Sequence, residues 1–438
     1  MRDDRPEALR HFILHPSPFI LLLFLAARIP LLLVRDTFFD ELFTRWIAGK
    51  SFAGILSALR HDSGPPLYYF VVHLLGDPSV VATRVVSLLF AAISIGLILR
   101  SGRAGSTVAA ILLAVFPPAV LFAVDARAYA TCAMFVTIAV LAVDDDRPVV
   151  AALALVGAGY CHYYGVLLFP ILLLGPAAEP AAVQPAGRRR YAWRSYVRRR
   201  YASFGALALA VVLYLPGFWL AWHQPAGARA WMSVSWPDAL FVRPPVALAI
   251  LGAVVLALSV RVNRYMVMVL VPLILAIALR VYVPLRFEAV IAAPLVLWVA
   301  ESLRHNRLRL ALTTALIGIA AIWSVLGIID HVHRPLDPYR QAAVWVAGNI
   351  PVNQTVVASG YCYLETLMNG HTNVAAFPPE QGEHPGWRAL PLAGVPAPPG
   401  AFFWIGERGA PELGILLRQH RVIKPLFIND RAMVALVR

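Results

Sequence analysis

Two adjacent carboxylates stand directly after the first long apolar segment of the chain, in the sequence Phe39-Asp40-Glu41-Leu42. A carboxylate near the membrane loses hydration, and a poorly hydrated carboxylate is a stronger base than a solvated one. Asp40 and Glu41 are therefore candidates for removing a proton from a hydroxyl or an amine. The alternative is structural, because acidic residues also favour the amino end of a helix that follows them.

A second polar motif, Asp125-Ala-Arg-Ala-Tyr129, follows a later apolar segment and is expected on the same face of the membrane as Asp40. Asp125 and Arg127 either belong to the same site or form a simple ion pair at the membrane boundary. Between the two acidic motifs, Ser63-Gly-Pro-Pro-Leu-Tyr-Tyr69 contains paired prolines that fix the start of a partly buried helix.

Arg84 and Arg286 lie in or at the ends of apolar segments. An ionisable side chain at membrane depth is costly and is a functional candidate by default. The alternative is that such a side chain extends along the apolar surface to place its charge at the interface.

The elements that must position these residues follow from the composition. Of the 438 residues, 60% are hydrophobic and 14% are charged, whereas soluble domains have about 45–50% apolar and 25% charged residues. The apolar residues gather in runs of about 15–22, most of them long enough to cross a hydrocarbon layer of ~30 Å. The composition excludes a soluble globular protein and indicates a polytopic membrane protein.

About eleven membrane spans are predicted. They lie near 17–34, 80–99, 106–124, 129–143, 148–162, 164–178, 203–221, 244–260, 265–281, 286–301 and 309–329. The segment 148–178 is divided in two at His162-Tyr-Tyr-Gly165. Loops on one side are rich in arginine, above all 188–200 with seven arginines in thirteen residues, which predicts that this side is cytoplasmic.

This topology places the long first loop, 35–66, and the last hundred residues outside the cytoplasm. The segment 331–438 alternates between helical and β-branched patterns, with helices expected at 338–349 and 411–420 and strands at 355–358, 402–405, 422–423 and 433–437. The predicted fold is therefore an all-α membrane domain, 1–330, followed by a small extracytoplasmic α/β domain.

The net charge of +14 would raise the question of a nucleic-acid partner in a soluble protein. Here the basic residues gather in the short loops of one membrane side, so no nucleic-acid partner is expected and the predicted location is the cell membrane. Cys132, Cys161 and Cys362 are an odd number without metal-ligand spacing, which excludes a disulfide framework.

The motifs together resemble the GT-C glycosyltransferases. The resemblance rests on Asp40-Glu41, on Pro65-Pro-Leu-Tyr-Tyr69, on Arg84 and on the acid-x-Arg-x-Tyr motif at Asp125. Within this superfamily the chain is similar to the protein O-mannosyltransferase and aminoarabinose transferase branch. The resemblance implies transfer of a sugar from a polyprenyl-phosphate donor, dolichyl or undecaprenyl, to a glycan, lipid or protein acceptor on the outer face of the membrane.

The resemblance also implies roles for individual residues. Asp40 takes the catalytic acidic position, with Glu41 beside it and Asp125 in the second acidic motif. Cations for the donor phosphate are expected at Arg84, Arg127 and Arg286. Further substrate contacts are expected at His61, Tyr68, Tyr69, His162, Tyr163 and Glu288. This chain departs from many relatives by having Gly64 before the paired prolines, where they have His, and Asp125 where they have Glu.

A lipid phosphate is a stable leaving anion and needs cations rather than a general acid. One carboxylate then suffices for direct displacement, so we predict inversion at the anomeric carbon with Asp40 as the base. Glu41 or Asp125 orients the acceptor, or Asp40, Glu41 and Asp125 together hold a divalent cation, Mg or Mn, through oxygen ligands. No other cofactor is expected.

Two rival functions remain at this point. A lipid transporter or flippase would use the same charges to move cargo, but the sequence shows no paired broken helices of the kind that transporters use. A non-catalytic relative would bind a polyprenyl lipid only. The adjacent carboxylates Asp40 and Glu41 favour an enzyme over this second rival.

Overall fold

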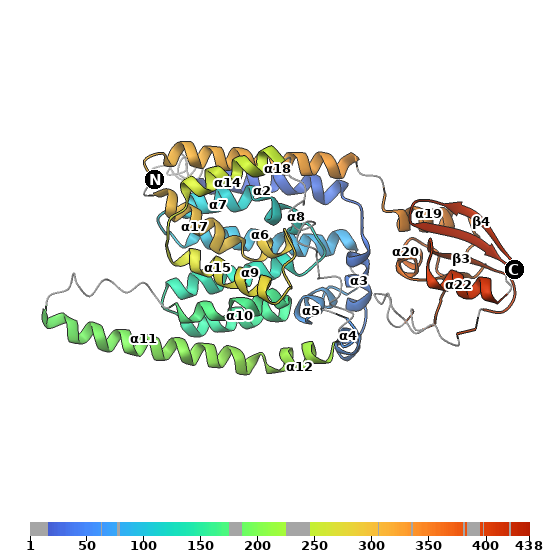
Figure 1. The fold of residues 1–438 in the computed structure, drawn as a ribbon, viewed down its shortest axis with the longest axis horizontal. Helices are drawn as coiled ribbons and strands as arrows, with labels where there is room; N and C mark the ends of the chain where they lie inside the picture. Colours follow the sequence, from blue (N-terminus) through green and yellow to red (C-terminus); the bar gives the residue numbers. More distant parts are fainter. Residues whose placement is uncertain are drawn as a thin grey trace, which may run out of the picture.

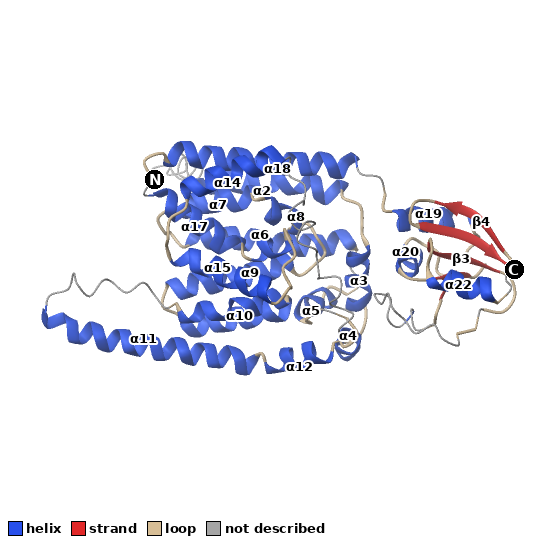
Figure 2. Cartoon of the chain, in the orientation of Figure 1, coloured by secondary structure: helices blue, strands red, loops and turns tan. Residues whose placement is uncertain are grey.

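The computed structural model describes residues 16–62, 64–76, 79–174, 186–224, 246–304, 306–333, 336–379, 382, 395–396, 398–419 and 422–438. A large helical body is followed by a smaller α/β domain, which lies at one end of the body (Figures 1 and 2). The described helices of the body are α2 (Pro16–Val34), α3 (Phe39–Ala48), α4 (Phe52–Leu59), α5 (Leu67–His73), α6 (Val80–Arg100), α7 (Ser106–Val115), α8 (Pro117–Phe122), α9 (Tyr129–Asp144), α10 (Pro148–Cys161), the 3-10 helix η1 (Tyr163–Leu173), α11 (Ala186–Leu213), α12 (Leu215–His223), α14 (Val246–Ser259), α15 (Arg264–Ala278), α16 (Arg286–Val290), α17 (Ala292–Arg304) and α18 (Arg309–His333).

Within the described residues, every predicted apolar segment contains helix. Three helices are long and apolar enough to cross a membrane, namely Ser17–Val34, Val80–Arg100 and Arg309–Asp330, and the pair Arg198–Leu213 and Leu215–His223, bent by 45°, forms a fourth candidate. Several other apolar helices are shorter because they are interrupted, as α7 and α8 are at Pro117. The total of eleven crossings therefore stays a prediction.

The predicted division at His162 coincides with a real break. Helix α10 ends at Cys161, and the chain continues as the tighter 3-10 helix η1, a form that the sequence did not predict. Gly165 makes this possible, because a Cβ atom there would lie 2.3 Å from the backbone of Ala158. The glycine thus allows η1 to turn back directly onto the end of α10.

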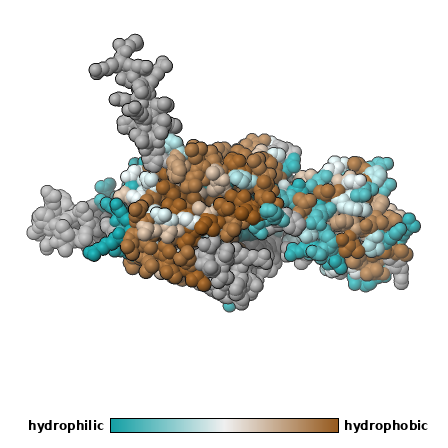
Figure 3. Space-filling view, turned by 90° about the horizontal axis from the view of Figure 1, so that it is seen from above, coloured by the Kyte–Doolittle hydropathy of each residue, from teal (hydrophilic) through white to brown (hydrophobic). Residues whose placement is uncertain are grey.

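The outer surface of the helical body is largely apolar. Figure 3 shows hydrophobic residues covering the middle of the body, with hydrophilic residues gathered toward its ends. Large side chains such as Leu22, Leu33 and Leu89 are 66%, 74% and 58% exposed. So much exposed apolar surface is unfavourable in water and is typical of a protein that hydrocarbon solvates. The chain is a membrane protein.

The C-terminal domain is built on a five-stranded sheet in the order β2-β1-β3-β5-β4. Its strands are β1 (Val356–Ala358), β2 (Val374–Ala376), β3 (Phe402–Glu407), β4 (Ile423–Ile428) and β5 (Ala432–Val437), and its helices are α19 (Pro338–Asn349), α20 (Tyr361–Met368) and α22 (Pro411–Arg418). Strand β1 is parallel to β2 and β3, whereas β5 is antiparallel to β3 and β4. Buried residues of α19 and α20 pack on one face of the sheet, and those of α22 pack on the other.

The sequence predicted this α/β pattern with two omissions. The helix over 338–349 has its predicted bounds, and the predicted strand segments near 355, 402, 422 and 433 all contain strand. Helix α20 and strand β2 were not predicted. Both are short, and β2 is half-exposed, so neither produces a long periodic pattern of apolar residues.

Helix α20 joins the domain to the first loop of the body. The ring of Tyr361 meets that of Phe39 edge to face at a centroid distance of 4.3 Å, and Leu364 is buried among apolar side chains of α3 to α5. Arg340 forms an ion pair with Asp36. The domain is therefore attached to the segment that carries Asp40.

Glu365 is buried at this junction. Burial, and then the like charge of Asp337, raise the pKa of Glu365 to about 7, against the opposite effects of Arg340 and of a hydrogen bond from Asn369. Because the folded state holds the proton more tightly than the unfolded chain does, this group favours folding at low pH. That contribution is lost as the pH rises from about 4.5 toward 7.

Replacing Glu365 with Gln should therefore raise thermal stability at pH 8 and leave it nearly unchanged at pH 5. The upper limit of the gain at pH 8 is roughly 3 kcal/mol, from one pKa unit being worth about 1.4 kcal/mol. Unfolding of the purified protein in detergent would be followed at both pH values. The exposed Asp430, changed to Asn, is the control, and an equal shift at both pH values would contradict the prediction.

Candidate functional site

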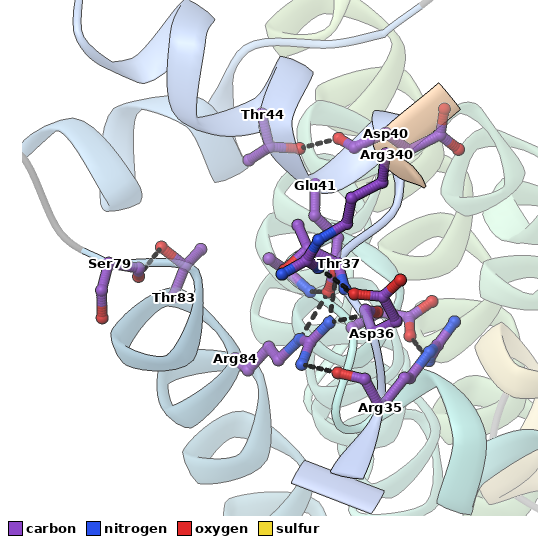
Figure 4. Close-up of polar contacts among 12 residues, drawn as sticks. Arg35, Asp36, Thr37, Asp40, Glu41, Thr44, Ser79, Thr83, Arg84 and Arg340 are labelled. Carbon is purple, nitrogen blue, oxygen red and sulfur yellow. Dashed lines mark hydrogen bonds and ion pairs between the residues drawn. The ribbon is translucent and has the colours of Figure 1, made fainter. Parts of the chain in front are cut away.

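The buried ion pair between Glu41 and Arg84 joins three parts of the body. Arg84 Nε donates to Glu41 Oε1 at 2.8 Å, and its Nη2 pairs with the second carboxylate oxygen. The same guanidinium donates to the carbonyls of Arg35 and Asp36, each at 2.9 Å (Figure 4). Glu41 Oε1 also accepts the N–H of Ala126 at 2.9 Å. The pair therefore connects α3, α6 and the turn before α9.

This geometry gives Glu41 and Arg84 a structural role, and their predicted roles toward a substrate stay predictions. Glu41 is 0% exposed and Arg84 is 2% exposed, and every nitrogen of the guanidinium donates to an atom of the protein. Arg84 uses four of its five N–H groups in these contacts, and both side chains are enclosed by the protein. The charge that the sequence places in an apolar segment belongs to a buried ion pair in the structure.

Asp125 also has a partner that the sequence did not predict. It forms an ion pair with Arg35 at the end of α2, not with Arg127, and its side chain is 2% exposed. The predicted catalytic role of Asp125 stays a prediction. The three acids proposed for a divalent cation thus lie in separate contacts, and within the described residues no group of three or more His, Cys, Asp or Glu is placed to hold a metal ion.

Asp40 is the acid that remains available. Its carboxylate lies 3.7 Å from the Arg286 guanidinium, and the two side chains are 35% and 27% exposed. The expected dehydrated carboxylate is therefore wrong for Asp40, which is partly open to solvent. The alternative of acidic residues at a helix start is confirmed in part: Asp40 and Glu41 lie in the first turn of α3, although the N-cap residue itself is Phe38.

Arg127 and Arg286 both face a cavity of about 330 Å³ next to Asp40. Arg127 Nη1 donates to the Asp40 carbonyl and to Thr44 Oγ1, each at 3.3 Å. Arg286 begins α16 after Leu285, whose backbone φ is +65°. Such a left-handed conformation is costly for leucine, and strain of this kind is typical of residues that position a functional side chain.

The cavity is lined mainly by apolar and aromatic side chains, with Arg127 and Arg286 among them. The lining residues are Thr44, Gly64, Pro65, Tyr68, Tyr69, Arg127, Ala128, Tyr129, Cys161, His162, Tyr163, Tyr164, Val166, Leu167, Tyr214, Phe218, Ala221, Leu279, Val281 and Arg286. Such a cavity suits a ligand that has an anionic head and a hydrocarbon tail.

Four of the predicted substrate contacts line this cavity: Tyr68, Tyr69, His162 and Tyr163. His162 stands between Tyr129 and Tyr164, at centroid distances of 5.1 and 4.4 Å. Its Nδ1 accepts the Tyr164 N–H at 3.2 Å. The tautomer with the proton on Nε2 therefore fits, and it presents one donor.

Glu288 and His61 do not line the cavity. Glu288 Oε1 accepts a hydrogen bond from the hydroxyl of Tyr282 at 2.5 Å, which keeps it within its own segment. Thr44, Tyr164 and Gln224 were not predicted from the sequence, although Gln224 accepts from Tyr163 at 2.8 Å and so holds a cavity residue in place. The sequence feature that could have indicated Gln224 is its place as a polar residue at the end of an apolar helix rich in aromatic residues.

The sequence matches no family model and no curated protein. Among solved structures, the chain is similar to ArnT from Cupriavidus metallidurans in the apo state, with 13% identity over 98% of both chains and a TM-score of 0.57. The structure of the same protein bound to undecaprenyl phosphate gives 13% identity over 97% of this chain and 98% of that one, with a TM-score of 0.56. A weaker similarity, with 17% identity and a TM-score of 0.43 over 80% of this chain and 29% of that one, is to the mycobacterial arabinofuranosyltransferase AftD.

The chain is thus a membrane protein with the GT-C fold, as the sequence motifs predicted. More particularly, its fold is similar to that of ArnT over nearly the whole length of both chains.

The structural role of Glu41 can be tested against its neighbour. Glu41→Gln leaves Arg84 as an uncompensated buried charge, which should cost about 3–5 kcal/mol of stability. Asp40→Asn removes the same charge one residue earlier from a partly exposed side chain and should change thermal stability little. Both variants would be unfolded by heat in detergent, and a Glu41→Gln protein with the parent midpoint would contradict the assignment.

Proposed function

We propose that the protein is a membrane glycosyltransferase that moves a sugar from a polyprenyl-phosphate donor to an acceptor at the outer face of the membrane. One observation carries the proposal: the Asp40 carboxylate stands 3.7 Å from the guanidinium of Arg286, which lines a cavity of mainly apolar and aromatic side chains. The fold supports it, since ArnT shares this fold and has been solved bound to undecaprenyl phosphate.

The two cavity arginines would hold the phosphate of the donor. As the bond between the anomeric carbon and the phosphate oxygen breaks, negative charge grows on the lipid phosphate. Guanidinium groups of Arg127 and Arg286 can stabilise that charge through charge-assisted hydrogen bonds. The apolar side chains of the cavity, such as Val166, Leu167 and Phe218, would contact the first prenyl units.

Asp40 would act as the base. Its partly exposed carboxylate can receive the proton of an acceptor hydroxyl or amine while that oxygen or nitrogen attacks the anomeric carbon. The new glycosidic bond forms as the polyprenyl phosphate leaves with its electron pair, so one displacement inverts the anomeric configuration. Glu41 and Asp125 are held by Arg84 and Arg35 and take no part in this step.

The orientation in the membrane is also part of the proposal. Helix α3, which carries Asp40, and the C-terminal domain lie toward one end of the body, whereas the loop from α6 to α7 and the start of α11 lie toward the other (Figure 1). Arg100 ends α6, Arg103 lies in that loop, and Arg188 to Arg190 follow the first residues of α11. Arginine-rich loops favour the cytoplasmic side, which supports a chain of eleven crossings with the site and the C-terminal domain outside.

Asp40→Asn should lower sugar transfer by at least about 100-fold, because loss of a general base typically costs that much or more. Affinity for undecaprenyl phosphate should stay within about twofold of the parent, since Asp40 contributes no donor to the phosphate. Transfer from a radiolabelled polyprenyl-phosphate sugar would be measured with purified protein in liposomes. A variant that transfers at the parent rate would exclude Asp40 as the base.

Arg286→Met should weaken binding of undecaprenyl phosphate by about 10- to 100-fold, the usual effect of losing a hydrogen bond between charged groups. Binding would be measured by titration of the lipid phosphate into detergent-solubilised protein. Arg280→Met is the matched control, since Arg280 is exposed, lies six residues earlier and does not line the cavity. Equal affinity in the two variants would remove Arg286 from the phosphate site.

A further inference from the structure

Arg28 is a charged residue in the interior of the helical body. It lies in α2 and is 1% exposed, with its guanidinium carbon 4.1 Å from the centre of the Phe24 ring. Among the described residues, no carboxylate forms an ion pair with Arg28, whereas Arg35 pairs with Asp125 and Arg84 pairs with Glu41. A charge in this position is costly unless its donors find strong acceptors.

The acceptors are backbone carbonyls at the break between α7 and α8. Arg28 Nη1 donates to the carbonyl of Ala114 at 2.7 Å, and Nη2 donates to that of Leu113 at 3.4 Å. In an unbroken helix these two carbonyls would accept the N–H groups of the residues four positions later. Those residues are Pro117 and Pro118, which have no N–H to give.

A third carbonyl at the break, that of Val115, also accepts a hydrogen bond from a side chain. Val115 accepts the hydroxyl of Ser324, from α18, at 3.1 Å. Arg28 Nη2 also donates to the carbonyl of Ala119 in α8, at 3.2 Å. The guanidinium thus binds carbonyls on both sides of the break and fixes α8 relative to α7.

We propose that Arg28 is a positioning residue for the site, a conclusion that rests on the proposed function. Helix α8 leads directly into the turn at 123–128. In that turn the Ala126 N–H meets Glu41 and the Arg127 side chain meets Thr44 and the Asp40 carbonyl. By supplying the donors that the two prolines lack, Arg28 holds α8 in the direction that brings Arg127 to the cavity.

The carboxyl end of α8 is bound by Arg35, the residue that directly follows α2. Arg35 lies seven residues after Arg28, about two helical turns further on and on a similar face of the segment. Its guanidinium donates to the carbonyl of Leu121 and pairs with Asp125. Arg28 therefore binds the start of α8 and Arg35 binds its end. A substitution at Arg28 should displace α8 and, with it, the side chain of Arg127.

The test uses Arg28→Met in the full-length protein, which removes the donors and keeps an apolar side chain of similar length. We expect amide hydrogen exchange in the peptide covering 119–128 to become at least about tenfold faster. The kcat of sugar transfer should fall by about 10- to 100-fold, since small misplacements of catalytic groups have effects of this size. Exchange is measured without substrate, so this arm stands even if the transfer assay shows that the proposed function is wrong.

A variant with alanines at both prolines separates positioning from stability. In Arg28→Met with Pro117→Ala and Pro118→Ala, the backbone can supply its own donors, so the thermal midpoint should return to near the parent value. Transfer should stay low, because a straightened helix no longer directs the turn toward the cavity. Recovery of parent kcat in this triple variant would overturn the proposal, since Arg28 would then act on stability alone.

Arg28→Lys keeps the test decisive if the Met variant fails to fold. An ammonium has no fork of donors and cannot bind carbonyls on both sides of the break as a guanidinium does. We expect a folded protein with intermediate hydrogen exchange at 119–128 and a kcat between those of the parent and the Met variant. Parent values for both exchange and kcat in the Lys variant would contradict the proposal.

Discussion

The candidate site depends on a buried, bidentate ion pair between Glu41 and Arg84. Glu41 and Arg84 are removed from solvent, which costs several kcal/mol for each charge, and that cost is offset only because their polar atoms are well satisfied. The carboxylate accepts from α6 and from the turn before α9, and the guanidinium also binds the carbonyls that follow α2. The first turn of α3, and with it Asp40, is thereby fixed relative to the cavity.

Arginine has two separate uses in the helical body. Arg28, Arg35 and Arg84 donate to backbone carbonyls where helices end or are interrupted, and thus replace hydrogen bonds that the broken helices cannot make. Arg127 and Arg286 instead face the cavity. In a hydrocarbon environment, a carbonyl without a hydrogen-bond donor and a cation without a polar partner are both costly. Each of these arginines therefore needs acceptors from the protein or from a ligand.

Hydropathy and turn residues were sufficient to predict the helical segments, the break at His162 and most of the C-terminal domain. The motifs also predicted the GT-C fold. They could not separate Asp40 from Glu41, because adjacent residues on a helix differ by about 100° in direction, and only packing decides which one is enclosed. The partner of Asp125 was equally hidden, since Arg35 lies ninety residues away in the chain and no local pattern connects the two.

The C-terminal domain also contacts the segment that carries Asp40. Asp36 is bound by Arg340 and by the backbone N–H of Asp337, while Phe39 meets Tyr361. These contacts lie just before Asp40 in the sequence, and Glu41, which directly follows Asp40, is bound by Arg84. The Asp40 side chain is 35% exposed, so its orientation depends on these contacts of neighbouring residues and not on burial of the side chain itself. The contacts restrict the mobility of the segment while the Asp40 carboxylate stays partly open to solvent.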